Sequence, residues 1–465
     1  MVLKTIIQYI PEVRKPSEKK VSFNTKLKWT LIILGAFFVL ANIQLYGLSA
    51  NALGRFEYLA IILGTDFGSV ISLGIGPIVM SSIILQLLVG AGILNIDTKT
   101  DEGKRYFQGI QKIGVLFFIV FEAIIYVVMR GLEAAPGYSG IVITQLILGG
   151  LAIMYMDEVS QKWGFGSGVS LFIVAGVAWR LFTGLFQFIG TQGQNCLVDF
   201  TGTSYTPCTG RVFVIIQSII NGAPTEAVVA LATIIATAVI FVGVVWAQSL
   251  KVEVPLTYDR LRGYGVKWPL AFFYTSVLPV ILVSALIANI QLFASLLENW
   301  FGRATILGGF SSSGQAISGF SYWVGSSNLL ELILRQSTTF SAILQGITHL
   351  ITYMFLSMVF AIFWMKTSNM DAGSQAKNII SSGLQIPGFR KDERVLESIL
   401  SRYIMPLTVM GGLAIGALAA VANSLGALTS GTAILLAVMI TYQMYQNIAQ
   451  QHALDMHPAL RKIMA

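Results

Sequence analysis

The residues from Leu73 to Gly92, LGIGPIVMSSIILQLLVGAG, decide the fold of this chain. The stretch is apolar enough to cross a membrane as a helix, but Gly74, Gly76 and Pro77 loosen its start and remove a backbone donor. A second apolar piece, Phe56–Leu63, precedes it and is too short to cross a bilayer of about 30 Å. A half-helix, a break and a full helix are typical of membrane proteins that line an aqueous cavity, because unsatisfied backbone groups cannot face lipid.

The composition of the whole chain requires a lipid environment. Of the 465 residues, 55% are hydrophobic and 11% are charged, against roughly 25% charged in soluble domains. The polar, basic start predicts no cleavable signal peptide. Two cysteines and three scattered histidines exclude a disulfide-dense scaffold and a metal cluster. No nucleotide-binding loop or hydrolase motif is complete, so we expect neither a cofactor nor an enzyme.

Apolar runs predict an all-α polytopic membrane protein with ten crossings. They are Trp29–Tyr46, Leu73–Leu94, Ile113–Leu132, Gly140–Met156, Gly168–Ile189, Ala227–Ala247, Leu270–Leu297, Ile343–Met365, Tyr403–Asn423 and Thr429–Ala449. Residues 1–28 form an N-terminal tail whose first ten residues have the spacing of a helix lying in the membrane interface. Residues 450–465 form a C-terminal tail.

Charge predicts the orientation of these crossings. With both termini in the cytosol, 24 of the 30 Lys and Arg residues lie on the cytosolic side, as the positive-inside bias requires. Residues 29–191 and 226–449 then hold five crossings each and start on opposite sides, which is typical of an inverted repeat. Pro77 and Pro279 are predicted to interrupt corresponding helices, and residues 192–225 form the extracytosolic connection between the halves.

Several motifs resemble the SecY family. GIGPIVMSSIILQLL in the first stretch is similar to one family signature, in an archaeal or eukaryotic form, and MDEVSQKWGFGSGVSLFI, Met156–Ile173, is similar to another. The resemblance continues through VEVPL at 252–256, ANIQL at 288–292 and GFRK at 388–391. It implies a channel in the cytoplasmic membrane that passes unfolded polypeptides outward and releases apolar segments sideways into lipid.

By this resemblance, six branched aliphatic residues form a pore ring. An apolar constriction resists hydration yet can deform around a passing chain. The resemblance also makes residues of about 55–65 a plug helix that seals the closed pore, although a re-entrant helix that never moves is the alternative. The ring maps to Ile75, Val79, Val169, Ile173, Ile281 and Leu436, and the plug to Phe56, Leu59 and Ile62.

Glu122 lies in the middle of an apolar span, where a charge costs roughly 2.5–3.5 kcal/mol. It must therefore face protein or water, or be protonated. The resemblance groups it with Gln86 and Asn289 in a polar cluster whose hydrogen bonds would close a lateral gate. Ser81 or Ser82 would compensate for Met80, where the family often has a polar residue. A single buried hydrogen bond between helices is the alternative.

The cytosolic loops 250–269 and 366–402 are expected to bind partner molecules in the cytosol. Loop length, Pro255 and two nearby glycines predict a shaped hairpin in the first loop. The resemblance implies that both loops bind the ribosome or another motor, since guanidinium groups suit RNA phosphates. The residues are Arg260, Arg262, Lys267, Arg390 and Lys391.

Other partners and alternatives complete the prediction. The resemblance implies two small membrane subunits, of the SecE and SecG or Secβ types, besides signal peptides, nascent chains and lipid. Cys196 and Cys208 share the extracytosolic loop, where a bridge would add about 3 kcal/mol; free thiols are the alternative. A secondary transporter built from inverted repeats is the alternative function, and a scaffold without conduction is a third.

Overall fold

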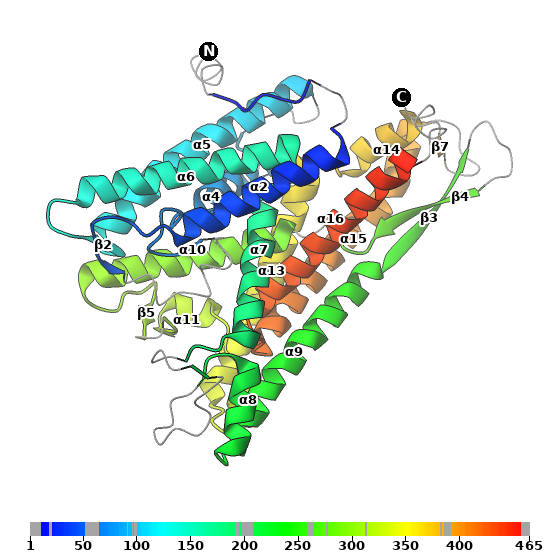
Figure 1. The fold of residues 1–465 in the computed structure, drawn as a ribbon. Helices are drawn as coiled ribbons and strands as arrows, with labels where there is room; N and C mark the ends of the chain where they lie inside the picture. Colours follow the sequence, from blue (N-terminus) through cyan, green and yellow to red (C-terminus); the bar gives the residue numbers. More distant parts are fainter. Residues whose placement is uncertain are drawn as a thin grey trace.

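The computed structural model describes residues 11–17, 21–51, 65–90, 92–94, 96, 100–190, 195–196, 208–258, 265–275, 278–311, 314–381, 384–385 and 392–456. Long helices dominate this part of the chain (Figure 1). They are α2 (Phe23–Asn42), α4 (Gly76–Gly90), α5 (Asp101–Val128), α6 (Ser139–Trp163), α7 (Gly168–Phe186), α9 (Pro224–Ser249), α10 (Leu278–Phe301), α13 (Phe340–Thr367), α15 (Glu393–Ser424) and α16 (Gly431–Met456).

Each of the ten predicted crossings corresponds to one of these helices. By length and composition, eight helices in the described ranges can cross a membrane, namely all of the ten except α4 and α16. Helix α4 has only 15 residues, and α16 has polar residues in its last turns. The count of ten crossings and the inverted symmetry of the halves therefore remain predictions.

The two prolines expected to interrupt helices instead stand at helix starts. Pro77 is the second residue of α4 and Pro279 is the second residue of α10. Proline suits this position, because the N–H it lacks would have no partner in the first turn. The prediction of a seventh crossing from Leu270 was also wrong, since residues 270 and 271 belong to a strand.

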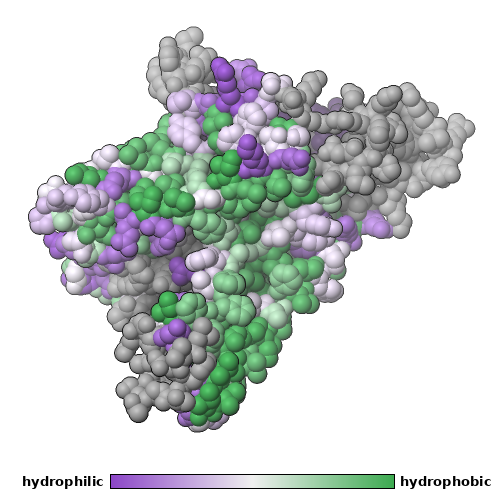
Figure 2. All heavy atoms as spheres, in the orientation of Figure 1, coloured by the Kyte–Doolittle hydropathy of each residue, from purple (hydrophilic) through white to green (hydrophobic). Residues whose placement is uncertain are grey.

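The surface of the helices is apolar where a membrane would surround it. Along α9, large apolar side chains are exposed over the full helix, including Val228 at 51%, Val242 at 65% and Trp246 at 65%. Figure 2 shows this hydrophobic surface along α8 and α9, while hydrophilic residues gather near the N-terminal segment. An exposed apolar face of this length is stable only against lipid or another membrane protein.

Helices α2 to α7 pack together as one half, and α9 to α16 as the other. The halves meet at two places. At the seam, α4 packs against α10 and α13; at the back, α7 packs against α16. Within the second half, α13 and α15 pack so closely that a Cβ added to Gly412 of α15 would lie only 2.9 Å from the Met358 Cα of α13. Glycine at such contacts lets helix backbones pack tightly in membranes.

The connection between the halves is compact. Its short helix α8 (Arg211–Ile220), which the sequence analysis missed, packs against α9. A disulfide joins Cys196 to Cys208, so the bridged alternative is confirmed. Gly210 N–H donates to Gln187 O (3.1 Å), and Thr209 Oγ1 donates to Ile189 O (2.6 Å). The connection is thus tied by covalent and hydrogen bonds at its two ends.

The shorter elements lie at the two ends of the helices. Strands β1 (Leu48–Asn51) and β2 (Leu132–Ala134) pair, as do β5 (Gly309–Phe310) and β6 (Ala316–Ser318). Strands β3 (Lys251–Tyr258) and β4 (Gly265–Ala271) form the hairpin expected in the first cytosolic loop. β7 (Leu384–Gln385), from the second loop, adds to β3. The remaining short helices are α11 (Phe320–Val324), α12 (Leu329–Leu334) and α14 (Ala372–Ser381).

Candidate pore and lateral gate

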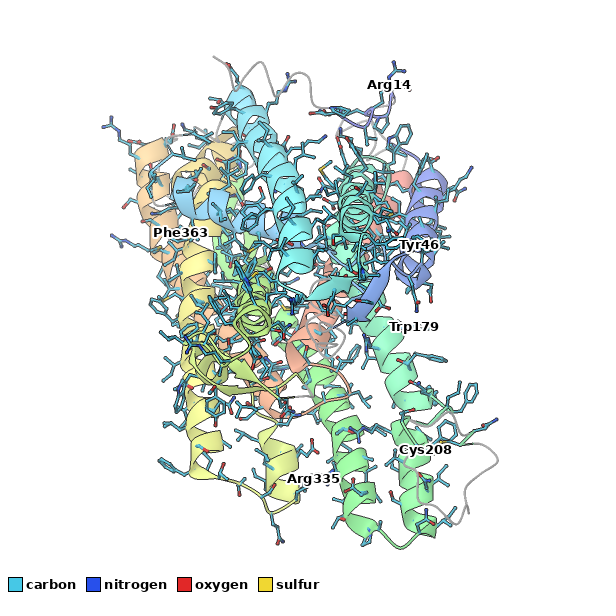
Figure 3. All side chains as sticks on the ribbon, turned by 90° about the vertical axis from the view of Figure 1, so that its left-hand side faces the viewer. Arg14, Tyr46, Trp179, Cys208, Arg335 and Phe363 are labelled. Atoms are coloured by element: carbon cyan, nitrogen blue, oxygen red, sulfur yellow. A yellow bond between two sulfur atoms is a disulfide. The ribbon has the colours of Figure 1, made fainter. Side chains whose placement is uncertain are left out.

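Two cavities enter the molecule. The small cavity has a volume of about 200 Å³ and is lined by residues such as Thr30, Ser160 and Asn447. The large cavity has a volume of about 890 Å³ and is lined by residues such as Gln187 and Arg335. Figure 3 places Arg335 and Cys208 at the end of the molecule opposite Arg14. The lining of the large cavity is rich in polar groups, whereas the small cavity is lined by polar side chains such as Ser160 and Asn447 together with apolar ones such as Leu278 and Met444.

Three helices, α7, α10 and α16, contribute residues to both cavities. The two cavities therefore lie along the same helices, one toward each end. Helix α7 lines the small cavity with Ser170 and the large one with Thr183. Helix α10 does so with Leu278 and Ser284, and α16 with Ile440 and Thr432. The residues between these pairs form an apolar barrier. It contains Ile173 and Leu436, both fully buried, and Ile281, which is 5% exposed on the wall of the small cavity.

Helix α4 brings the other predicted ring residues to the same core. Ile75 is fully buried and Val79 is 4% exposed, and Val169 packs against this core from α7. Gly74 has a φ of 53°, a conformation that favours glycine, at the tight turn that leads into α4. All six predicted ring residues therefore belong to one hydrophobic core cluster or pack on it. The predicted plug residues Phe56, Leu59 and Ile62 lie outside the described residues.

The expected hydrogen bonds among Gln86, Glu122 and Asn289 are not formed. All three side chains are buried, but Gln86 Oε1, both Glu122 carboxyl oxygens and Asn289 Oδ1 have no hydrogen-bond partner in the part of the chain described. Glu122 lies against Gly76, where an added Cβ would be 3.1 Å from its Oε2. Gln86 is ten residues further along α4, about 15 Å by helical rise. The polar cluster is thus spread along α4 rather than gathered.

Ser81 and Ser82 do not complete this cluster either. Ser81 Oγ donates to Gln111 O (2.8 Å), and Gln111 Nε2 donates to Ser82 Oγ (2.6 Å). Both contacts join α4 to α5 inside the first half. At the seam itself the contact is apolar and close: a Cβ on Gly90 would lie 3.2 Å from Phe363 Cβ of α13. The Phe363 ring of α13 therefore packs directly on the α4 backbone at Gly90.

A buried polar network on the wall of the large cavity escaped the sequence analysis. His349 Nδ1 donates to Val324 O (2.7 Å), since a carbonyl oxygen can only accept. The other ring nitrogen then accepts from Asn423 Nδ2 (3.2 Å), and Asn423 Oδ1 accepts from Thr432 N–H (2.8 Å). A single histidine in an apolar run gives no signal in sequence. The network joins α11, α13, α15 and α16.

The predicted docking residues are described only in part. Arg260, Arg262, Arg390 and Lys391 lie outside the described residues, and Lys267 is in β4. What the structure adds is the pairing of Thr257 with Gln385, which makes the two cytosolic loops one three-stranded sheet in the order β4-β3-β7. Within the described residues, no group of three or more His, Cys, Asp or Glu side chains is arranged to hold a metal ion.

Two cavities on opposite sides of an apolar barrier, within a bundle of membrane-length helices, define the class of polytopic membrane channels. A sequence profile of the SecY family matches residues 69–445. The chain is 39% identical over 464 residues to the protein translocase subunit SecY of Methanothermobacter thermautotrophicus, covering 99% of this chain and 97% of that protein. It is 37% identical to the same subunit of Methanocaldococcus jannaschii, covering 99% and 98%. The chain belongs to the SecY family.

Solved structures agree with this assignment. A structure described as a protein conducting channel is similar with a TM-score of 0.83 and 36% identity, covering 98% of this chain and 99% of that one. Sec61 in a canine ribosome-channel complex is similar with a TM-score of 0.80 and 34% identity, with the same coverage. These matches favour the channel over the transporter and scaffold alternatives. They leave the fold class as predicted: an all-α membrane protein of the SecY type.

Proposed function

We propose that this chain forms the pore through which unfolded polypeptides cross a membrane and from which apolar segments leave sideways into lipid. The observation that carries the proposal is the apolar barrier between the small and large cavities. A narrow apolar region excludes water and ions while it is closed. Aliphatic side chains can also move aside for a peptide without leaving a charge unpaired. A pore of this kind needs no catalytic group.

The ring is tested by ion conductance. Replacing Ile75 and Val79 together with glycine should let the closed channel leak ions in planar bilayers, because the barrier loses its branched side chains. The matched control replaces Leu31 and Val39 of α2 with glycine. These side chains are 59% and 62% exposed, so the control introduces the same two glycines without changing the barrier. Leakage equal in both variants, or absent from both, would contradict the ring.

Passage of the substrate is tested by photo-crosslinking. A stalled secretory chain should label probes placed at Ile75, Ile173 and Ile281, which belong to the barrier. It should not label a probe at Val242, which is 65% exposed on the lipid-facing side of α9. A chain that labels only Val242 would remove the pore from this part of the molecule. The plug at residues 55–65 remains part of the proposal by family resemblance.

The seam between α4 and the pair α10 and α13 is the proposed lateral exit. Two helices of this seam carry a buried oxygen without a partner, Gln86 Oε1 on α4 and Asn289 Oδ1 on α10, and the two carboxyl oxygens of Glu122, beside Gly76 at the start of α4, also lack one among the described residues. Each such atom costs about 1–3 kcal/mol relative to a hydrogen-bonded state. Opening the seam would admit water or a substrate backbone that satisfies them. The closed seam is therefore held by apolar packing and weakened by its polar groups, which suits a gate that must open.

The cytosolic sheet is the proposed docking surface for a motor, with the ribosome as the favoured partner. The pairing of β3 with β7 joins the two loops, and a similar chain, canine Sec61, occurs in a ribosome-channel complex. Reversing the charges of Arg260, Arg262 and Arg390 should weaken co-sedimentation with ribosomes, most strongly at low salt. Reversing Arg303 on the opposite side serves as control. Undiminished binding at moderate salt would remove this proposal.

Membrane location, orientation and small subunits complete the proposal. We place the chain in the cytoplasmic membrane with both termini in the cytosol, supported by the charge bias and by the disulfide at the end opposite Arg14 (Figure 3). Disulfides persist in oxidising compartments, so the Cys196–Cys208 end faces outward. Subunits of the SecE and SecG or Secβ types are proposed from the family alone. The exposed apolar faces of the helices leave room for them within the membrane.

A further inference from the structure

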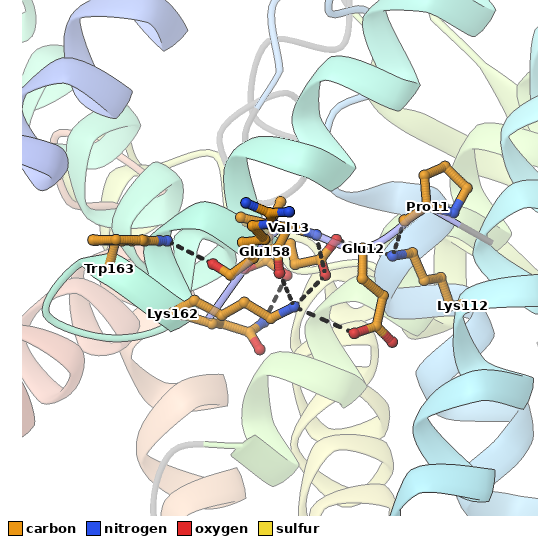
Figure 4. Close-up of polar contacts among 10 residues, drawn as sticks. Pro11, Glu12, Val13, Lys112, Glu158, Lys162 and Trp163 are labelled. Atoms are coloured by element: carbon orange, nitrogen blue, oxygen red, sulfur yellow. Dashed lines mark hydrogen bonds and ion pairs between the residues drawn. The ribbon is translucent and has the colours of Figure 1, made fainter. Parts of the chain in front are cut away.

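A short N-terminal segment lies across the cytosolic ends of α5 and α6 and is held there by its backbone (Figure 4). Four side chains of these helices contact residues 11–14. Lys112 Nζ donates to Pro11 O (2.8 Å), and Val13 N–H donates to Glu158 Oε1 (3.1 Å). Lys162 Nζ donates to Val13 O (2.6 Å), and Trp163 Nε1 donates to Arg14 O (2.9 Å). All four hydrogen bonds are made to the main chain of the segment.

Glu158 is the centre of this contact. Its Oε2 pairs with Lys112 Nζ at 2.9 Å and its Oε1 with Lys162 Nζ at 2.7 Å. All three side chains are only 16–17% exposed, whereas Glu12, which pairs with Lys162 at 3.5 Å, is 64% exposed. Two lysines this close and this shielded need the Glu158 carboxylate between them. The segment thus completes a partly buried ion cluster that bridges two helices.

The same point of α5 also holds the gate helix. Lys112 contacts the N-terminal segment, and the preceding residue, Gln111, makes both hydrogen bonds to Ser81 and Ser82 of α4. Helix α4 carries Val79 and directly follows Ile75, two of the proposed ring residues, and it forms one side of the seam. A continuous set of contacts therefore runs from the segment through Lys112 and Gln111 to α4.

We propose that residues 11–14 form a clasp, bound by Lys112, Glu158, Lys162 and Trp163, that positions α5 and through it holds α4 in the closed gate. This inference rests on the proposed channel function. While the clasp is bound, α5 cannot shift along α6 without breaking the Glu158 cluster. Release of the clasp removes the bonds from Pro11 and Val13 and leaves the Lys112–Glu158 pair alone between α5 and α6 at this point, so α5 shifts more easily, and α4 moves with it because of the bonds to Gln111. The clasp makes the N-terminal tail a regulator of opening.

The test compares Val13→Pro with Val13→Ala in the full chain reconstituted into bilayers. Proline removes the N–H that donates to Glu158, and alanine keeps it. Two readouts are measured separately: trypsin cleavage after Arg14, and the opening frequency of the channel in planar bilayers. Val13→Pro should raise both on the order of tenfold, as expected for loss of a hydrogen bond to a charged group, while Val13→Ala should leave both near the parent values.

A second variant guards against a folding defect. Lys112→Met keeps the stem of the side chain but removes the ammonium group from Pro11 and Glu158, and it should also raise both readouts. Faster cleavage with unchanged opening would overturn the coupling while leaving the channel function intact. Unchanged cleavage in both variants would show that these contacts do not hold the segment. A parent chain that never conducts or translocates would instead contradict the proposed function, since cleavage reads the clasp alone.

Discussion

The two places where the halves meet are built in opposite ways. At the back, α7 packs against α16, and the connection beside them is closed by a disulfide and by hydrogen bonds such as Thr209 to Ile189. Leu428 N–H, between α15 and α16, is satisfied by Thr237 Oγ1 of α9 (3.1 Å). At the seam, α4 meets α10 and α13 through apolar contacts, with buried oxygens of Gln86, Glu122 and Asn289 left without partners.

This difference assigns a mechanical role to each joint. Moving the back would break the hydrogen bonds that Thr209 and the Leu428 N–H make beside it, so this joint is expected to act as a fixed axis. At the seam, by contrast, each buried polar group without a partner costs the closed state about 1–3 kcal/mol. Opening lets water hydrogen-bond to these groups and so removes this cost. The molecule is therefore expected to open at the seam and to turn about the back. Three predictions test this contrast, from the largest expected effect to the smallest.

The largest effect should come from a covalent lock across the seam. Cysteines at Gly90 and Phe363 would place their Cβ atoms about 3.2 Å apart before relaxation, close to disulfide geometry. Oxidation of the Gly90→Cys, Phe363→Cys protein should abolish polypeptide translocation in vesicles, and a reductant should restore it. Each single variant and the parent are taken through the same cycle, because the reductant also reaches Cys196–Cys208. Full translocation by the cross-linked protein would rule out opening at the seam.

The next effect concerns the back. Replacing Cys196 and Cys208 with serine removes a cross-link between residues 12 apart, which should lower the free energy of unfolding by about 3 kcal/mol in the chain-entropy model. Urea unfolding in detergent measures this loss. Translocation at moderate temperature should persist, because the remaining hydrogen bonds still close the connection. A variant with unchanged stability, or one that is stable but inactive, would contradict the view of the back as a passive axis.

The smallest effect comes from filling a polar gap in the seam. Asn289→Leu keeps the branching and the number of side-chain heavy atoms and removes the Oδ1 atom that lacks a partner, at the loss of the Nδ2 hydrogen bond to Ala285 O, so the closed state should gain about 1 kcal/mol and opening should become rarer. The control is Asn423→Leu. Both ends of the Asn423 amide are hydrogen-bonded, so the same change should destabilise the protein. Channel opening frequency and thermal unfolding distinguish the two. Equal effects would mean that partner satisfaction is irrelevant.

The sequence predicted most of the helices but not how their polar groups pair. Long apolar runs are unambiguous, so α9 and α13 were found within a few residues. Helix α10 was extended too far toward its N-terminus, because Leu270 and Ala271 are apolar in a strand as well as in a helix. The short helix α8 was missed for a related reason: ten residues are too few to give a membrane signal, and its packing on α9 decides its structure.

The predicted ring and the predicted gate compare differently with the structure. Ile173, Ile281 and Leu436 could be placed by family resemblance, and burial in one core agrees with that placement. The Gln86, Glu122 and Asn289 cluster was expected to be hydrogen-bonded, but residue identity does not say where along a helix a partner stands. The clasp around Glu158 gave no signal in the sequence, because its hydrogen bonds are made by the main chain of Pro11, Val13 and Arg14. Sequence patterns report side chains, and this contact is made by the main chain.

The pairing of β7 with β3 has a consequence for how this chain can change over time. Because Thr257 and Tyr258 are in register with Gln385 and Leu384, an insertion in either cytosolic loop would shift the strands of the other. Lengthening one loop to suit a new motor is therefore constrained unless the second loop adapts with it. Paired changes in the two loops are the expected signature of such adaptation, and a chimera that exchanges one loop alone should assemble poorly.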